Sequence, residues 1–259
     1  MDLKIEGRVA MVAAASKGIG LATARALAGE GCRVSICGRT ESTLGEACER
    51  IGGTVRGYVA DVRSREDLER WVAHTSSELG APDILVTNTG GPPAGTLDAM
   101  DDSRWQEGFE STLLNVVRLV RLVGSGMAER GWGRIVHVSS LVAREPSSVL
   151  PISSTLRMGL QNLTRLQASE LAPRGVTVNA VLPGHTLTDR QRHLAQLRAE
   201  REGGTEDEAL ARQAESIPMR RIADPREIAD AIAFLCSERA SYITGVSLLV
   251  DGGATHAPG

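Results

Sequence analysis

A glycine-bearing turn near the start of the chain has the spacing of a phosphate-binding loop. An apolar run through Ala14 is followed by Gly18 and Gly20 and then by a helical pattern at residues 21–30. Glycines here let the backbone approach a pyrophosphate, and free N–H groups at a helix N-terminus bind its charge. Two glycines alone also fit a plain turn, so it is the strand–turn–helix context that favours dinucleotide binding.

The second apolar run ends in Cys37-Gly38-Arg39, where a dinucleotide-binding chain usually has the acid that holds the ribose of NAD. An acid would repel a 2′-phosphate, whereas an arginine can bind it in bidentate fashion. Lys17 adds a second positive charge. The alternative is that Arg39 and Lys17 are solvated surface residues. We expect the cofactor to be NADP(H) rather than NAD(H).

Short apolar runs that must position these residues recur along the chain as continuous Val, Ile, Leu and Ala segments. Strands buried on both faces, as in parallel sheets covered by helices, have this pattern. The predicted strands are residues 8–14, 33–37, 54–59, 84–87, 134–139, 177–181 and 247–250.

Helical patterns lie between the predicted strands. Ser64 begins a capping-box pattern before residues 65–78, and Asp224 begins a second one, with Pro225 and Glu227, before residues 225–237. The other predicted long helices cover residues 103–129 and 153–172. The alternation predicts one α/β domain over residues 1–259, a Rossmann-type doubly wound parallel sheet flanked by helices on both faces.

The composition restricts the class of protein. The chain has 259 residues, 42% hydrophobic residues, 3% aromatic residues and a formal net charge of −3. Neither the charge nor the few aromatic rings favours nucleic acid as a partner. No apolar run approaches a membrane span. The four cysteines show no metal-binding spacing, which predicts reduced thiols in a cytoplasmic protein without a metal.

The ordered motifs resemble the short-chain dehydrogenase/reductase family, most closely its 3-oxoacyl-acyl-carrier-protein reductase-like branch. The likeness covers nearly the whole chain, with Ala13 and Ala14 in place of the Thr and first Gly of the family's TGxxxGIG. The matching segments are residues 13–20, Asp61-Val62, residues 87–90, residues 133–136 leading to Ser139-Ser140, residues 176–184, residues 243–245 and residues 250–253.

This resemblance implies a set of cofactor-binding residues around one sheet edge. They are Ala14, Ser16, Lys17, Gly18, Ile19, Gly20, Arg39, Asp61, Val62, Asn88, Gly90, Arg157, Pro183, Gly184, Thr186 and Thr188. It also implies a homotetramer or homodimer, because the family pairs its two long helices across a two-fold interface.

The expected catalytic residues depart from the family pattern. The resemblance implies that Ser140 hydrogen-bonds the substrate oxygen and that Asn115 helps to hold a relay water. The family's Tyr-x-x-x-Lys pair aligns with Ser153 and Arg157, and both tyrosines of this chain lie elsewhere. An aliphatic alcohol is far less acidic than a phenol, and an arginine does not readily exchange protons. Arg157 can still bind ribose hydroxyls.

Three histidines are candidates for proton transfer. His185 follows the segment beside the nicotinamide and is a candidate proton donor; His193 lies in the next segment. Either can instead be solvent-exposed or structural. His137 shares a strand face with Ser139, and we interpret it as a packed, hydrogen-bonded residue.

The segment at residues 185–218 contains seven acids and five bases. We interpret it as a mobile helical lid over the substrate; the alternative is an exposed helix pair used in subunit contact. The leading hypothesis is an NADP(H)-dependent oxidoreductase acting on a carbonyl or alcohol substrate, possibly 3-oxoacyl-like, with an atypical proton relay. Two alternatives stay open: a dinucleotide-binding sensor or partner subunit with little or no activity, and non-redox chemistry such as an elimination.

Overall fold

Seven parallel strands form one sheet in the order β3-β2-β1-β4-β5-β6-β7 in this computed structural model, which describes residues 1–256. The strands are β1 (Val9–Val12), β2 (Arg33–Gly38), β3 (Val55–Val59), β4 (Ile84–Thr87), β5 (Gly133–Val138), β6 (Val176–Pro183) and β7 (Ser247–Val250). The order reverses between β1 and β4, and doubly wound sheets bind their ligands at such a switch point.

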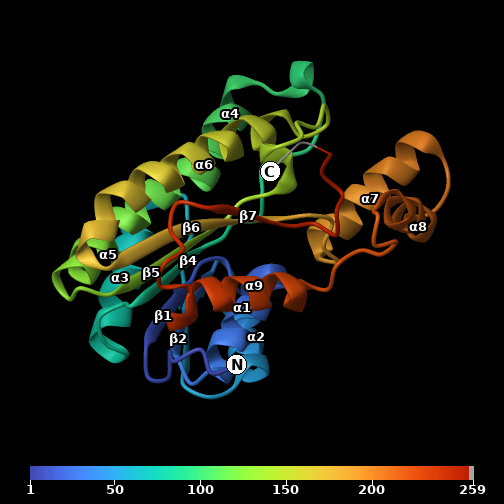
Figure 1. Cartoon of the computed structure of the whole chain (residues 1–259). Helices are drawn as coiled ribbons and strands as arrows, with labels where there is room; N and C mark the ends of the chain where they lie inside the picture. The colour runs from blue at the N-terminus through green and yellow to red at the C-terminus, as the bar shows by residue number, and fades with distance from the viewer. Residues whose placement is uncertain (257–259) are drawn as a thin grey trace.

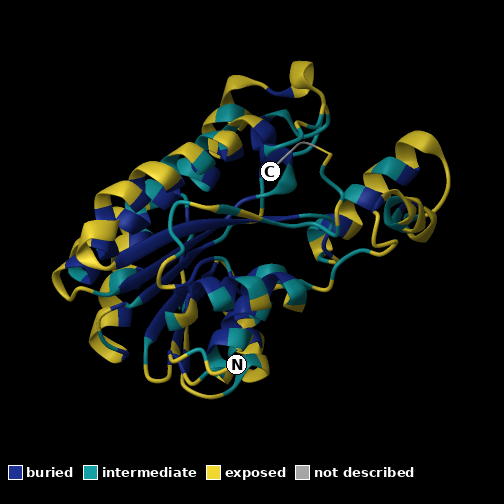
Figure 2. Cartoon of the chain, in the orientation of Figure 1, coloured by how far each residue is buried: buried dark blue, intermediate teal, exposed yellow. Residues whose placement is uncertain are grey.

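Helices cover both faces of the sheet (Figure 1). The α-helices are α1 (Gly18–Gly29), α2 (Glu41–Ile51), α3 (Arg65–Glu78), α4 (Asp102–Phe109), α5 (Asn115–Glu129), α6 (Pro151–Leu171), α7 (Asp189–Glu202), α8 (Glu206–Ser216) and α9 (Pro225–Leu235). One apolar core joins the sheet to α1, α2 and α9, and a second joins it to α3, α5 and α6. Figure 2 shows the inner strands buried between these two layers, whereas the edge strands β3 and β7 are partly exposed.

The predicted doubly wound parallel sheet is confirmed, and each predicted strand is present. Many boundaries differ by one or two residues, and two of the differences have a local reason. β1 ends at Val12 and not at residue 14, because Ala14 has a φ of +47°, which no strand residue adopts. The predicted helix at 103–129 is wrong as one α-helix: α4 and α5 are joined by a π-helical segment, Glu110–Leu114.

Both predicted helix caps form, with one difference. At Asp224 the capping box is complete, since the Asp224 side chain accepts from the first turn and the Glu227 carboxylate accepts from the Asp224 N–H at 2.9 Å. Ser64 Oγ accepts from the Asp67 N–H at 3.1 Å, but the Asp67 carboxylate accepts from the Asp61 N–H at 2.8 Å instead of completing the box. The start of α3 is thereby tied to the end of β3.

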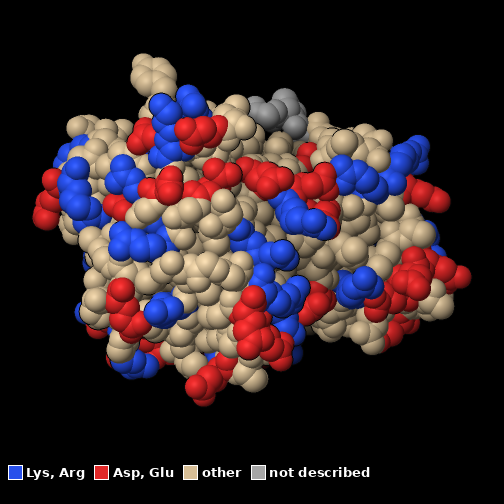
Figure 3. All heavy atoms as spheres, turned by 90° about the horizontal axis from the view of Figure 1, so that it is seen from below, with Lys and Arg blue, Asp and Glu red and all other residues tan. Residues whose placement is uncertain are grey.

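Residues 185–218 contain α7 and α8, which pack on each other at one side of the molecule (Figure 1). Acidic and basic side chains are mixed on the face that Figure 3 displays. Within residues 1–256, no helix combines the length and the apolar character needed to cross a bilayer.

Candidate active site

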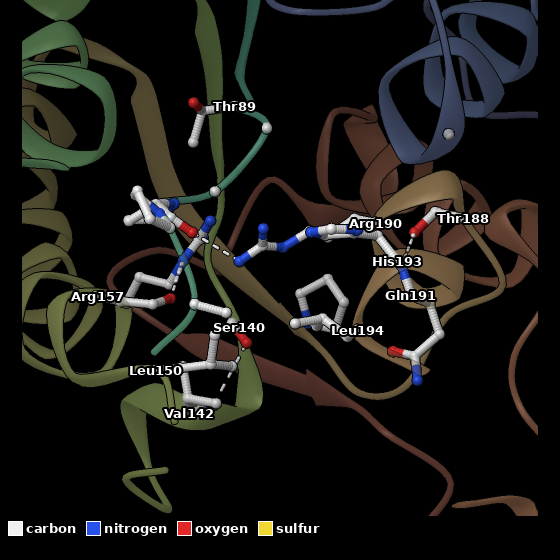
Figure 4. A pocket seen from close by; sticks show the side chains of 18 of the residues that line it. Thr89, Ser140, Val142, Leu150, Arg157, Thr188, Arg190, Gln191, His193 and Leu194 are labelled. Carbon is white, nitrogen blue, oxygen red and sulfur yellow. Dashed lines mark hydrogen bonds between the residues drawn. The ribbon is translucent and has the colours of Figure 1, made fainter. Parts of the chain in front are cut away.

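A cavity of about 1310 Å³ lies beyond the carboxyl ends of the central strands. The loops that follow β1, β2, β3, β4, β5 and β6 all contribute to its wall, together with one side of α7 (Figure 4). Residues that are far apart in the sequence therefore meet at one sheet edge, as expected for a doubly wound fold.

The turn between β1 and α1 forms one end of the cavity. Gly18 has a φ of +56°, and a Cβ on Gly20 would lie 2.7 Å from the Ala14 carbonyl oxygen. α1 starts without a side-chain cap and without an acidic residue in its first turn. Its first N–H groups are therefore available to an anion, and the turn fits a pyrophosphate.

Ala14 is held in the left-handed region by its neighbours. Asn88 Nδ2, at the end of β4, donates to the Ala14 carbonyl oxygen at 3.1 Å. The Ala15 N–H donates to the Cys37 carbonyl oxygen at 2.9 Å. These bonds fix the turn against two neighbouring strands.

Charged residues at the ribose end of the cavity have different partners. Arg39 is exposed and forms no ion pair within residues 1–256. Lys17 Nζ lies 3.4 Å from Asp189 Oδ2, at the start of α7. The Arg63 guanidinium donates to Asp61, with a shortest distance of 2.6 Å, and lowers the pKa of that carboxyl. Arg39 is thus the cation here that is free to meet a phosphate.

Two serines and an arginine form the other end of the cavity. Ser140 Oγ accepts from the Val142 N–H at 3.4 Å, at the start of a short 3₁₀ turn after β5. Ser153 lies in the first turn of α6, and Arg157 lies one turn later. Arg157 Nε donates to Ser153 Oγ at 3.2 Å, and its Nη1 donates to the Val138 carbonyl oxygen at 2.9 Å.

Arg157 is a buried cation, with 6% of its surface exposed. Burial, and then the nearby positive charge of Arg190, lower its pKa to about 10, so it stays charged at neutral pH. Its Nη2 donates to no group within residues 1–256. Close by, the Ser139 hydroxyl lines the cavity and is buried without a hydrogen-bond partner in that range. Both groups are available to a ligand.

The histidines occupy three different environments. His185 lines the cavity and is half-buried, and burial, followed by the charge of Arg198, lowers its pKa below 6.5. His193 lines the cavity and is exposed. His137 is fully buried, with its ring nitrogens 2.9 Å from Thr87 Oγ1 and 2.9 Å from Gln167 Oε1. The interpretation of His137 as a packed residue is confirmed.

Among the expected site residues, all but Asn115 and Gly20 line the cavity. Gly20 lies behind the turn, where its missing side chain lets Ala14 and Asn88 approach. Asn115 is 1% exposed, begins α5 directly after the π-helical segment, and accepts from the Val116 N–H at 2.7 Å. π-helical turns often occur at functional sites. The role implied for Asn115 stays a prediction.

Sequence reasoning did not single out four arginines of the site. Arg63, after β3, and Arg190, Arg198 and Arg201, on α7, line the cavity. Arg190 Nη2 donates to the Pro92 carbonyl oxygen at 2.6 Å, and so joins α7 to the loop after β4. The available signal was the spacing of arginines along a polar helix, which exposed helices also show.

Comparisons with known proteins agree with this site. Residues 13–255 match the family model described as Enoyl-(Acyl carrier protein) reductase. A 3-oxoacyl-[acyl-carrier-protein] reductase of Vibrio cholerae is 35% identical over 251 residues, covering 97% of this chain and 98% of that protein. L-sorbose reductase from Gluconobacter frateurii, solved with NADPH and L-sorbose, has a TM-score of 0.94 at 34% identity and full coverage of both chains. A single-residue variant of the actinorhodin polyketide ketoreductase, solved with NADPH, has a TM-score of 0.93 at 33% identity, covering 96% of this chain and 98% of that one.

Proposed function

We propose a reaction for this chain, which belongs to the short-chain dehydrogenase/reductase family: the NADPH-dependent reduction of a small carbonyl substrate. The observation that carries it is one cavity with a phosphate-binding turn at one end and the Ser140, Ser153 and Arg157 cluster at the other. Both solved relatives named above contain NADPH, and the Vibrio relative is named as a reductase.

The preference for NADPH rests on Arg39. No acid stands at the end of β2, and Arg39 lines the cavity without an ion-pair partner within the described residues. A guanidinium there binds a 2′-phosphate through two parallel hydrogen bonds. The first turn of α1 would bind the pyrophosphate, and Asp61 and Val62 would lie beside the adenine.

The residues at the substrate end act on the oxygen of the carbonyl group. When bound, the nicotinamide supplies the hydride to the carbonyl carbon. The Ser140 and Ser153 hydroxyls each accept a hydrogen bond and donate none within residues 1–256, so both can donate to the substrate oxygen. The buried Arg157 charge stabilises the negative charge that develops there, in surroundings where water does not screen it.

The proton that completes the alcohol comes by an atypical route. Ser153 is too weak an acid to replace a phenol, and Arg157 keeps its proton. His185 lies in the cavity wall on the loop after β6 and is half-buried, whereas His193 is exposed on α7. We propose that His185 supplies the proton. The Ser153–Arg157 pair also supports a second function, a dinucleotide-binding sensor or partner subunit, because that pair lacks a strong general acid.

The cofactor assignment is tested by calorimetric titration with NADPH and NADH. We expect the wild type to prefer NADPH and Arg39→Asp to lose that preference. Arg50→Asp is the matched control, since Arg50 is exposed in the last turn of α2 and does not line the cavity. Equal affinities in the wild type would overturn the assignment.

The reaction is tested by following NADPH consumption with a panel of diketones, ketoses and 3-oxoacyl thioesters. We expect Ser140→Ala to slow turnover, and His185→Ala to slow it by about 10²–10⁴-fold, the usual contribution of a positioned acid. His193→Ala should change turnover little. NADPH binding without consumption of any substrate would favour the sensor or partner subunit.

We also propose a homotetramer, by the family's pairing of its two long helices. The α6 side chains Met158 and Leu166 are 45% and 68% exposed in the single chain, and a second subunit packed on α6 would bury them. Light scattering at micromolar concentration should give four times the mass of one chain. A cytoplasmic location is supported by the four free cysteines and is tested by cell fractionation.

A further inference from the structure

Two guanidinium groups converge on the substrate end of the cavity. Arg157 comes from α6 and Arg190 from α7, and Figure 4 shows the two side chains extending toward one another. Each is hydrogen-bonded only to neutral groups: Arg157 to Ser153 and a backbone carbonyl, and Arg190 to the Pro92 carbonyl at 2.6 Å. Within residues 1–256 neither forms an ion pair with a carboxylate.

Other arginines of the same region are paired. Arg192, two residues after Arg190, lies 3.0 Å from Glu206 on α8. Arg63 is bound by Asp61 and Glu107, and Arg201 by Glu202. Arg198 also lines the cavity, and its Nη1 donates to the neutral side chain of Gln213. Among these arginines, the two that converge on the substrate end of the cavity, Arg157 and Arg190, lack a carboxylate partner within residues 1–256.

This arrangement is unfavourable for the protein by itself. Burial lowers the pKa of Arg190, and burial, followed by the charge of Arg190, lowers the pKa of Arg157, so neither guanidinium is stabilised by its surroundings. Arg190 is also the second residue of α7, where the helix dipole disfavours a positive charge. A buried charge without a counter-ion costs stability, and a bound anion would remove that cost.

We propose that the substrate carries a carboxylate besides its carbonyl group, and that Arg190, supported by the charge of Arg198, binds it. This inference rests on the proposed reductase function and names its substrate class as small oxo acids. The planar fork of Arg190 matches the two oxygens of a carboxylate. A phosphate usually occupies free N–H groups at a helix start, but Thr188 Oγ1 already accepts from the Gln191 N–H at 3.3 Å at the start of α7.

The division of labour between the two arginines follows from their neighbours. Arg157, on α6, donates to Ser153 and to the carbonyl of Val138, at the end of the strand that leads to Ser140, so its charge lies beside both serines. Arg190 enters the cavity from α7, where its guanidinium donates to the carbonyl of Pro92 in the loop after β4. A carboxylate on Arg190 cancels the repulsion between the two cations and leaves the Arg157 charge for the carbonyl oxygen.

The experiment compares acids with their neutral counterparts. The probes are 2-oxobutanoate, 4-oxopentanoate and 5-oxohexanoate, each paired with its methyl ester, and dihydroxyacetone phosphate. For each pair, kcat/KM is taken from NADPH consumption, and calorimetry measures binding of the same acids and esters to the protein with and without NADP⁺. The variants are Arg190→Gln and the control Arg192→Gln, whose side chain points to α8.

We expect an acid to be preferred over its ester by roughly 10- to 100-fold, which is the usual value of a charge-assisted hydrogen bond. Arg190→Gln should abolish that preference and Arg192→Gln should keep it, with NADPH affinity unchanged in both. Equal binding of acid and ester by the wild type would overturn the proposal. So would an equal loss for acid and ester in Arg190→Gln, which would make Arg190 only a latch between α7 and Pro92.

Two further outcomes separate this proposal from its alternatives. A fall in NADPH affinity in Arg190→Gln would assign Arg190 to the cofactor phosphates, and selective binding of dihydroxyacetone phosphate would assign it to a phosphorylated substrate; either result overturns the carboxylate. If acids bind selectively by calorimetry and no substrate consumes NADPH, the reductase function fails while the anion site stands. If esters are reduced as well as acids, the reductase stands and the anion site fails.

Discussion

Replacing Ala14 with glycine should stabilise this protein. Ala14 has a φ of +47°, and a Cβ in the left-handed region approaches the following carbonyl group. The resemblance to TGxxxGIG places a glycine at this position. The turn cannot relax, because Asn88 Nδ2 holds the Ala14 carbonyl oxygen at 3.1 Å and the next N–H is bound to the end of β2 at 2.9 Å.

The size of the effect follows from two opposing contributions to the free energy of unfolding. The left-handed conformation costs an L-residue about 1–2 kcal/mol, and Ala14→Gly removes that cost. Glycine gains more freedom than alanine in the unfolded chain, which costs about 0.5–1 kcal/mol. The net change is a stabilisation of up to about 1.5 kcal/mol, centred at about 0.75 kcal/mol, or roughly 2–3 °C in Tm for a chain of this size.

The assay is urea unfolding of the cofactor-free protein, followed by circular dichroism. Ala13→Gly is the control, because Ala13 lies in the same turn but does not have a positive φ. It should lose stability, since there the cost of glycine's freedom and the loss of a buried methyl group both apply. If Ala14→Gly loses as much stability as Ala13→Gly, the strain assigned to Ala14 is refuted.

Three further predictions concern other parts of the chain. Burial lowers the pKa of His137 to about 4, so the unfolded state binds more protons than the folded state below pH 6.5. The free energy of unfolding should therefore fall by about 2 kcal/mol from pH 7 to pH 5, and His137→Gln should reduce this loss; both are measured from urea unfolding midpoints. Ser153→Tyr with Arg157→Lys should change turnover of diketones little, since the proposed donor His185 already supplies the proton; a gain of about 10²–10⁴-fold in the double variant would overturn the assignment to His185. Asp224→Ala should cost about 1–2 kcal/mol by breaking the capping box of α9, whereas the exposed Asp230→Ala should change the urea midpoint little.

Much of the fold was predictable, because the five inner strands are almost fully buried and most of them are continuous apolar runs, whereas the edge strands β3 and β7 are partly exposed. What was missed lies where that signal is weak. α2 was not predicted, because its first and last turns are polar and it buries only Leu44 and Ala47. The π-helical segment between α4 and α5 was not predicted either, since the residues Glu110–Leu114 have an ordinary helical composition.

The cofactor end of the candidate site could also be predicted from the sequence, because its glycines and charged residues lie in short loops that directly follow the strands. The substrate end was not. Arg190 and Arg198 lie on a helix whose residues are mostly polar, and only the packing of α7 against the cavity shows which of its arginines face inward. Asn115 shows the converse: the family resemblance places it at the site, but its side-chain oxygen accepts from the N–H of the next residue, Val116, at 2.7 Å, and it does not line the cavity.

In the proposed reaction, the Ser153–Arg157 pair would change which step the protein assists. A phenol beside an ammonium gives up a proton, whereas a buried guanidinium with a pKa of about 10 keeps its own and supplies a fixed positive charge. Such a site stabilises the oxygen anion as hydride arrives and leaves its protonation to a slower donor. The Arg157 charge stabilises that anion best when it is not opposed by the charge of Arg190. A substrate carboxylate bound to Arg190 would neutralise that opposing charge. The Ser153–Arg157 pair and the unpaired Arg190 on α7 therefore both fit the proposed oxo acid substrate.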